Sequence, residues 1–492
     1  MQEGLNMENT TKFTHRYLAR FVIEAETPLA VGSGERDVMT DRLVATDVNG
    51  FPYIPGTALA GVLRNALTTS NNQNEINSLF GYQAKDDGQG SRLILSSAQM
   101  VGIDGKVIDG LQENKFENPF YANFKNLPIR QHVRISHKGA AEQGGKFDEQ
   151  VVYKGTRFCF EMELVGNKDD EESWEKLIAE FSNPAFRIGG GTRKGFGAIK
   201  VEDIKCKTLN LKVENELKMY LEKTAELNDK FWIEDYNYAK PTPQSENWIH
   251  YEITLTPDDF FLFGSGFGNE DGSADMSYVT EKVIDWSTGT GVFSDEKVLI
   301  PATSVKGALA HRTAFHFNKN LKLFSDELMQ DGKLESMLKE GYKIPETIKR
   351  FDSNIPDHRA RMASEGNPAV RAMFGYSAND DEGKRGNVIF SDIFSKNNFS
   401  KKLLNHVAID RFTGGAMDGA LFSEEVTATK EQFPLEIFVK KDMNGEYLEA
   451  FECALNDLCT GMLPLGGGTM RGHGCFNGTI YKNGIKYEPK CK

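Results

Sequence analysis

The sequence predicts an α+β protein in which one domain occurs twice. Five short motifs appear in the first half of the chain and reappear in the same order in the second half. A repeated order of motifs is the signature of a duplicated structural unit. Two homologous domains therefore explain the 492 residues better than the three that a domain size of roughly 150 residues would suggest.

Five pairs of segments define the repeat. They are VGSG from Val31 with FGSG from Phe263, YIPGTALAGVL from Tyr53 with LIPATSVKGAL from Leu299, LFGYQAKDD from Leu79 with MFGYSANDD from Met373, HVRISHKGAAEQGGKFDEQVV from His132 with HVAIDRFTGGAMDGALFSEEV from His406, and GGGTRKGFGAI from Gly189 with GGGTMRGHGCF from Gly466. The separation of the partners changes from pair to pair, so each copy carries its own insertions.

Each copy begins with a strand-like segment, RFVIEA or HYEITL, followed by a glycine motif and an extended segment that ends at Ile-Pro. Beyond the proline, Thr or Ser precedes apolar residues at i, i+3 and i+4 spacing, which predicts the start of a helix. Alternating apolar and polar residues farther along predict antiparallel strands around a glycine-rich turn. Each domain is thus expected to hold a sheet, one principal helix and a protruding hairpin.

Helical periodicity also predicts helices at 174–181, from about 210 to 232, and at 324–343 in the largest insertion of the second copy. The segment 236–247 is rich in Pro, Ser and Asn, which is typical of a linker. We therefore place the two domains at residues 1–240 and 241–492.

Composition excludes several classes of protein. The net charge of −13 excludes a uniformly basic nucleic-acid binder but leaves room for local basic grooves. The six cysteines form no CxxC pair, so neither a disulfide framework nor a zinc site is expected. The N-terminus does not look like a signal peptide, and no apolar run approaches the ~20 residues that span a bilayer. We expect a soluble, cytoplasmic protein.

The glycine loops are the first candidate binding sites. Bare backbone can approach a phosphate closely, and the adjacent hydroxyl and basic side chains supply donors and positive charge. The pattern is neither GxGxxG nor a P-loop, so no nucleotide cofactor is indicated. The alternative is a tight turn that needs positive φ. The candidate residues are Gly189, Gly190, Gly191, Thr192, Arg193 and Lys194 in the first copy, and Gly466, Gly467, Gly468, Thr469 and Arg471 in the second.

The Ile-Pro helices are the second candidate, because free amides at a helix N-terminus favour phosphate. The side chains that could assist are Thr57 and Arg64 in the first copy, and Thr303, Ser304 and Lys306 in the second. Ordinary capping of a packed helix is the alternative.

The third candidate is the hairpin tip of the second copy, where Arg411 and Phe412 precede a glycine-rich turn. An exposed aromatic beside a cation suits stacking on the bases of a single strand. His137 and Lys138 stand at the equivalent place in the first copy, without the aromatic. A solvated hairpin without ligand is the alternative.

IPGTALAGVLRNAL, HVAIDRFTGGAMDGALF and the GGGT-basic loops resemble the RAMP superfamily of CRISPR-associated proteins, specifically the backbone subunits of type III effector complexes. The resemblance covers 18–207 and 249–484, and two units in one chain resemble the fused backbone subunits of type III-D systems. It implies an RRM-like (ferredoxin-like) fold with a β-hairpin thumb. It further implies guide RNA, single-stranded target RNA and other effector subunits as partners, with target RNA cut beside each thumb.

The family's cleaving residue is an aspartate between the first glycine motif and the Ile-Pro helix, and Asp41 matches that pattern. A carboxylate with an ordinary pKa of about 4 is a weak base. The resemblance therefore implies that Asp41 positions the RNA or binds Mg²⁺ or another divalent cation. Glu35 and Asp37 lie close enough to compete for the assignment.

The second copy departs from the pattern. Aligning MTDRLV with VTEKVI sets Glu281 opposite Asp41, whereas Asp275 lies a few residues upstream in a longer loop. Either acidic residue, or neither, is expected to serve the second copy.

Two other functions stay open at this point. The chain could be a structural RNA-binding backbone without cleavage activity, or an endoribonuclease that processes guide precursors, although the histidine usual in that class has no clear counterpart.

Overall fold

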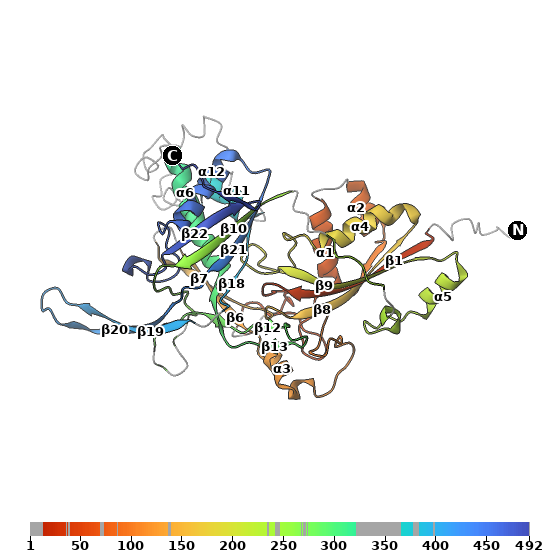
Figure 1. Ribbon diagram of the computed structural model, residues 1–492, viewed down its shortest axis with the longest axis horizontal. Coiled ribbons are helices and arrows are strands. Elements are labelled where there is room, and N and C mark those ends of the chain that lie inside the picture. Colours follow the sequence, from red (N-terminus) through yellow and green to blue (C-terminus); the bar gives the residue numbers. More distant parts are fainter. Residues whose placement is uncertain are drawn as a thin grey trace.

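The protein consists of two units of the same architecture, coloured red to yellow and green to blue in the computed structural model of Figure 1. The structure describes residues 13–35, 37, 40–68, 73–85, 87–135, 139–233, 236–241, 247–266, 268, 272, 274–320, 366–376, 383–396 and 399–491. No helix within these ranges is long and apolar enough to cross a membrane.

The sheet of the first unit is centred on β1 (His15–Ala25), whose residues alternate between buried and half-buried. β1 lies antiparallel between β8 (Arg157–Gly166) and β9 (Ile199–Asn210). With β4 (Leu93–Leu95) beyond β8, the strand order is β4-β8-β1-β9, and β5 (Gln99–Met100) also pairs with β8. This is the order of a β-α-β-β-α-β ferredoxin-like fold, as predicted.

Two helices supply the rest of the core. α1 (Gly56–Thr68) begins after the Ile-Pro motif, as predicted, and buries leucines at i, i+4 and i+8. α4 (Glu171–Glu180) buries Trp174, and both helices share one apolar cluster with Phe21 of β1. The remaining elements of this unit are α2 (Gln73–Phe80), β2 (Tyr82–Gln83), β3 (Gly88–Gln89), α3 (Pro119–Ala122) and α5 (Glu214–Glu222).

The second unit repeats this plan. β10 (Trp248–Pro257) lies antiparallel between β21 (Phe433–Lys440) and β22 (Phe476–Lys482), and β17 (Val388–Phe390) extends the sheet beyond β21. Its strand order, β17-β21-β10-β22-β23, is again ferredoxin-like. The other elements are β11 (Thr280–Glu281), β12 (Ile284–Asp285), β13 (Val292–Phe293), β14 (Lys297–Ile300), α6 (Ala302–Asn320), α11 (Pro368–Phe374), β15 (Gly375–Tyr376), β16 (Lys384–Arg385), β18 (Ile393–Phe394), α12 (Gly445–Cys459) and β23 (Ile485–Tyr487).

A long β-hairpin leaves each unit, and both hairpins were predicted. The first pairs β6 (Ile129–Ile135) with β7 (Ala141–Gln150), and the second pairs β19 (Ser400–Ile409) with β20 (Ala416–Ala428). Figure 1 shows the second hairpin reaching away from the body of the molecule. Each hairpin has a register shift near its tip, which adds local twist.

The base of the first hairpin enters the second unit. Arg130 on β6 donates to both carboxylate oxygens of Glu281 and, at 3.0 Å, to Oδ2 of Asp392. All three side chains are buried. A backbone bridge between Gly195 and Ser391 joins the units at a second point. We call this boundary the seam.

One sequence expectation lies outside the described residues, and two others have a different outcome. The helix predicted at 324–343 lies outside the described residues. The segment 210–232 is helical only at α5 and at the start of a 3-10 turn, Lys230–Ile233. No disulfide framework was expected, but Cys453 of α12 forms one disulfide with Cys491 near the C-terminal end of the chain.

Candidate nucleic-acid interface

Asp41 lies at the base of the first hairpin. Its Oδ2 accepts a hydrogen bond from the backbone N–H of Asp148 on β7, at 3.0 Å. The next residue, Arg42, forms a parallel bridge with Glu149, and its carbonyl accepts from the N–H of Gln150. Asp41 is exposed, so a ligand lying along the hairpin base can reach its carboxylate.

Asp275 occupies the same place in the second unit. Its Oδ2 accepts from the backbone N–H of Ser423 on β20, at 2.7 Å, and from the Ser423 hydroxyl, at 3.0 Å. These hydrogen bonds lower the pKa of Asp275. The following residue, Met276, forms a parallel bridge with Glu424. The shared pattern of backbone contacts makes Asp275 the structural counterpart of Asp41.

The alignment that set Glu281 opposite Asp41 does not hold in the structure. Glu281 lies on β11 at the seam, where it is buried against Arg130. Burial raises the pKa of Glu281, and the attraction of Arg130 opposes that shift only in part. A carboxylate enclosed in this way is not available to RNA. Asp41 and Asp275 are therefore the matched pair among the predicted acidic residues.

Packing explains the glycines of the two loops. The N–H of Gly190 donates to the carbonyl of Ala30 at 2.7 Å, and Gly467 makes the same hydrogen bond to Leu262. Gly189 has a φ of 86°, and a Cβ there would lie 2.8 Å from the Ala30 oxygen. Gly466 has the same φ, and a Cβ there would lie 2.4 Å from the Leu262 oxygen. Gly189 and Gly466 therefore require glycine whether or not RNA binds, whereas a Cβ at Gly467 would meet only ordinary contacts. The adjacent cations, rather than the Gly190 and Gly467 amides, are left to attract an anion.

The first glycine loop lies against the second unit. Arg193 donates to the carbonyl of Gly386 at 2.8 Å, and the hydroxyl of Thr192 accepts from Arg385 at 2.5 Å. A Cβ at Gly195 would lie 2.5 Å from the Cβ of Ala302, the first residue of α6. The Gly loop of one unit and the Ile-Pro helix of the other thus form one composite surface.

Basic side chains crowd at this surface. Burial, together with the charges of Lys194 and Arg193, lowers the pKa of Lys306 to about 8. Burial and the charges of Arg385 and Arg187 lower the pKa of Arg193 to about 9. Like charges held this close are unfavourable until an anion neutralises them. The seam therefore gathers positive charge from both units.

The N-terminus of α6 contributes less than predicted. Asp392 accepts a hydrogen bond from the N–H of Ala302 at 2.8 Å, so a carboxylate already satisfies the first helical amide. Thr303 and Ser304 follow it and are half-buried. On this helix, Lys306 is the predicted residue that joins the cation cluster.

The equivalent helix of the first unit, α1, lies apart from the seam (Figure 1). Thr57 is exposed near its start, and Arg64 donates to Asn77 of α2 at 3.3 Å. The structure does not bring these two predicted residues together with the cation cluster.

The tip of the second hairpin is fully solvated. Phe412 is 99% exposed, and Arg411 beside it is also exposed. Asp410 holds the turn, since its Oδ1 accepts from the N–H groups of Phe412 and Thr413. Phe412 is therefore not a core residue. His137 and Lys138, the predicted equivalents in the first hairpin, lie outside the described residues.

The sequence matches the RAMP superfamily over residues 22–200 and 285–477. The chain belongs to the RAMP superfamily. RAMP proteins bind RNA and work with other CRISPR subunits. The matched ranges include both hairpins, both glycine loops and Asp41, while Asp275 precedes the second range. No curated protein matches the chain closely enough to count as a relative.

Sequence reasoning missed a cluster that occurs in both RAMP units. In the second unit, Glu424 is fully buried and its Oε2 accepts from Arg471 of the glycine loop at 2.6 Å. Its Oε1 lies 2.9 Å from Nε2 of His406 on the opposite hairpin strand. The His406 ring stacks on Phe422 with centroids 4.8 Å apart.

The first RAMP unit has the same cluster. Glu149 is buried, with its Oε1 2.9 Å from Nε2 of His132 and 4.0 Å from Nζ of Lys194. His132 stacks on Phe147, and Lys194 lies over the same ring. Burial alone would raise the pKa of Glu149, but His132, Lys194 and Arg42 bring it below its usual value.

A signal for this cluster was present in the sequence. Aligning the fourth repeated motif pairs His132 with His406 and Glu149 with Glu424, and aligning the fifth pairs Lys194 with Arg471. Each residue by itself looks like an ordinary strand or loop residue. The set could be recognised only by comparing all three positions in the two copies.

Asp41 offers one protein carboxylate to a divalent cation. Among the described residues, no group of three or more His, Cys, Asp or Glu side chains could hold a metal alone. Mg²⁺ usually takes only one or two protein carboxylates and completes its shell with substrate phosphates and water. The exposed carboxylate of Asp41 can supply one such ligand.

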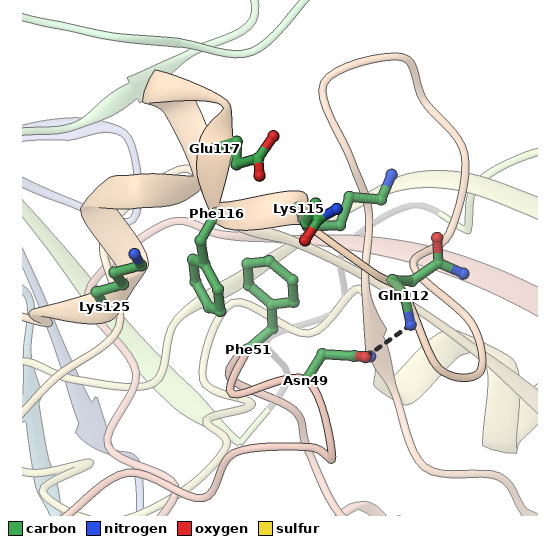
Figure 2. Close-up of a pocket in the computed structure, with 8 residues that line it drawn as sticks. Asn49, Phe51, Gln112, Lys115, Phe116, Glu117 and Lys125 are labelled. Carbon is green, nitrogen blue, oxygen red and sulfur yellow. Dashed lines mark hydrogen bonds between the residues drawn. The ribbon is translucent and has the colours of Figure 1, made fainter.

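A separate hollow of about 450 Å³ in the first RAMP unit is lined by the segment that connects β5 to β6 and by the loop before α1. Figure 2 shows Phe51 and Phe116 packed against each other within it, with Asn49 accepting a hydrogen bond from the N–H of Gln112. None of the predicted site residues lines it.

Proposed function

We propose that this RAMP protein is a guide-RNA-binding backbone subunit of a type III CRISPR effector complex and that it cleaves complementary target RNA. Its two fused units favour a type III-D-like double backbone. The cation cluster at the seam carries the proposal, because the glycine loop with Arg193 and Lys194 packs on the start of α6, the helix of Lys306. The charges of Arg193 and Lys194 act on Lys306. A sequence-independent RNA backbone is the ligand that neutralises such a cluster.

We assign cleavage to the hairpin bases. RNA is cut when its 2′-oxygen bonds to the adjacent phosphorus, the bond to the 5′-oxygen breaks, and a proton passes from the attacking to the leaving oxygen through water. Asp41, fixed by the Asp148 N–H, would orient the target strand for in-line attack. A divalent cation bound at Asp41 would stabilise charge on the phosphate. Asp275, fixed by Ser423, would do the same for the second unit.

Removal of the seam cations should weaken guide binding and reduce its salt dependence. We expect the double substitution Lys194→Ala and Lys306→Ala to lower affinity most at low salt. The slope of log affinity against log salt should shrink by about 0.7 for each phosphate of single-stranded RNA that the protein no longer neutralises. Arg471→Ala should act in the same way at the second glycine loop. Filter binding over a salt series measures both quantities.

Lys200→Ala is the matched control, because Lys200 pairs with Glu202 on β9 instead of joining the seam. Its slope should equal that of the unmodified protein. Equal slopes for all variants would contradict a guide-RNA path across the seam.

Phe412→Ala should slow target cleavage or shift its position while leaving guide affinity unchanged. Stacking of a base on an aromatic ring contributes about 1–3 kcal/mol, and the Phe412 ring is free to stack because it is almost fully exposed. Cleavage of end-labelled target by the assembled complex measures the effect. Phe412→Tyr should preserve cleavage, and neither change should alter the unfolding temperature. If cleavage by Phe412→Ala is normal, the tip does not contact the target.

A further inference from the structure

We propose that Glu149 and Glu424 are positioning residues, each connecting the guide-binding loop of its unit to the loop that carries the cleaving aspartate. The proposal rests on the function proposed above, and it assigns a role to the buried cluster found in both units. We call the connected groups of the second unit, from Arg471 through Glu424 to Asp275, the relay.

The first step of the relay is at the surface. Arg471 is 42% exposed, and one of its terminal nitrogens donates to Glu424, which is 0% exposed. A guanidinium carries five N–H donors in a rigid planar fork. Arg471 can therefore hold Glu424 with one edge and present the remaining donors to a phosphate of the guide.

The second step runs along β20. Glu424 directly follows Ser423, whose N–H and hydroxyl hold the carboxylate of Asp275. Successive side chains of a strand point to opposite faces. One dipeptide thus holds the glycine-loop cation on one side of the strand and the cleaving aspartate on the other. The parallel bridge of Met276 to Glu424 fastens the same two segments through their backbones.

The first unit repeats the arrangement with different chemistry at two places. Lys194 replaces Arg471 as the cation, and Asp148 replaces Ser423 as the residue that holds the aspartate. The buried glutamate and its histidine are the same in both units. The two copies thus keep the carboxylate even though its neighbours differ.

Energetics explain why a carboxylate matters here. Burying a charge is costly unless a partner compensates it, and packing alone would be served as well by the neutral amide of glutamine. The negative charge is required to hold the cation of the glycine loop in one place. A guide phosphate that fixes Arg471 therefore also fixes Glu424, and with it the strand that orients Asp275.

The test uses Glu424→Gln and Glu149→Gln in the assembled complex with saturating guide and target RNA. We expect Glu424→Gln to slow the cut of the second unit by about 10- to 100-fold, since small misplacements of reacting groups cost that much. The cut of the first unit should keep its rate. Glu149→Gln should give the reverse pattern. Single-turnover cleavage of end-labelled target separates the two products.

Matched controls test whether the effect is specific to Glu149 and Glu424 or follows from neutralising any glutamate of the hairpins. Glu142→Gln removes a more exposed ion pair with Arg134 on the first hairpin, and Glu425→Gln neutralises the neighbour of Glu424 on the same strand. Both should leave both rates unchanged. If they slow cleavage as much as Glu149→Gln and Glu424→Gln do, the effect is general and the relay is refuted.

Hydrogen exchange provides a readout that does not depend on cleavage. Guide RNA should slow amide exchange at residues 275–276 and 423–425 in the unmodified protein and much less in Glu424→Gln. Equal protection in both proteins would overturn the relay. If the unmodified complex makes no cut while guide RNA still protects these amides through Glu424, the cleavage function fails and the relay stands.

Discussion

Arg130→Met should lower the free energy of unfolding by about 3–5 kcal/mol, the usual cost of removing one partner from a buried ion pair. Arg130 donates hydrogen bonds to Glu281 and Asp392, and their charges raise its pKa against the opposing effect of burial. The substitution leaves both carboxylates buried without their cation. Urea-induced unfolding at pH 8 measures the loss.

The same variant should recover part of its stability at lower pH. Without Arg130, the pKa of Glu281 rises further above its value in the unfolded chain, so the folded state binds more protons than the unfolded state. Stability then increases as the pH falls through the folded pKa. We expect the deficit to be smaller at pH 5 than at pH 8.

Arg134→Met is the control on the same hairpin, because Arg134 is about half exposed and pairs with Glu142. A change within about 0.5 kcal/mol is expected for such a surface pair. If both variants lose equally little stability at both pH values, the buried triad does not hold the seam together.

Much of the fold could be predicted because local patterns encode it and the duplication shows them twice. Leucines spaced for α1, alternation along β1 and glycine-rich turns between hairpin strands are all short-range signals. The seam is different. Arg130, Glu281 and Asp392 come from three distant parts of the chain, and each has the residue type of an ordinary surface charge. Only the docking of one unit on the other buries them.

Only part of the candidate site could be predicted from the sequence, because the rest also depends on contacts between distant residues. The resemblance to the RAMP superfamily implies Asp41, because it stands where that family has its aspartate. The second copy has a longer loop there, so the sequence alignment matched MTDRLV to VTEKVI and placed Glu281, instead of Asp275, opposite Asp41. What makes Asp275 equivalent is its contact with Ser423, 148 residues away. Hydrogen bonds of that range leave no periodic trace in the sequence. For Gly189 and Gly466, packing against Ala30 and Leu262 already requires glycine, so the residue type alone does not distinguish a turn from a binding loop.

Asp41→Ala should remove one distinct cleavage product and Asp275→Ala another, each with a rate loss of at least about 100-fold at its own site. The expectation rests on the equivalent anchoring of the two carboxylates by Asp148 and Ser423 at the hairpin bases. Reconstituted complex with end-labelled target RNA and Mg²⁺ measures both products. Chelation of the metal should suppress both together.

Glu281→Ala provides the decisive contrast with Asp275→Ala. Because Glu281 is buried against Arg130, its loss should lower stability without selectively removing the second product. If Glu281→Ala removes the second product without lowering stability, Glu281 and not Asp275 is the counterpart of Asp41. If neither Asp275→Ala nor Glu281→Ala removes a product, the second unit is a scaffold. If Asp41→Ala removes none, the chain is a structural RNA-binding backbone, and cleavage belongs to other subunits.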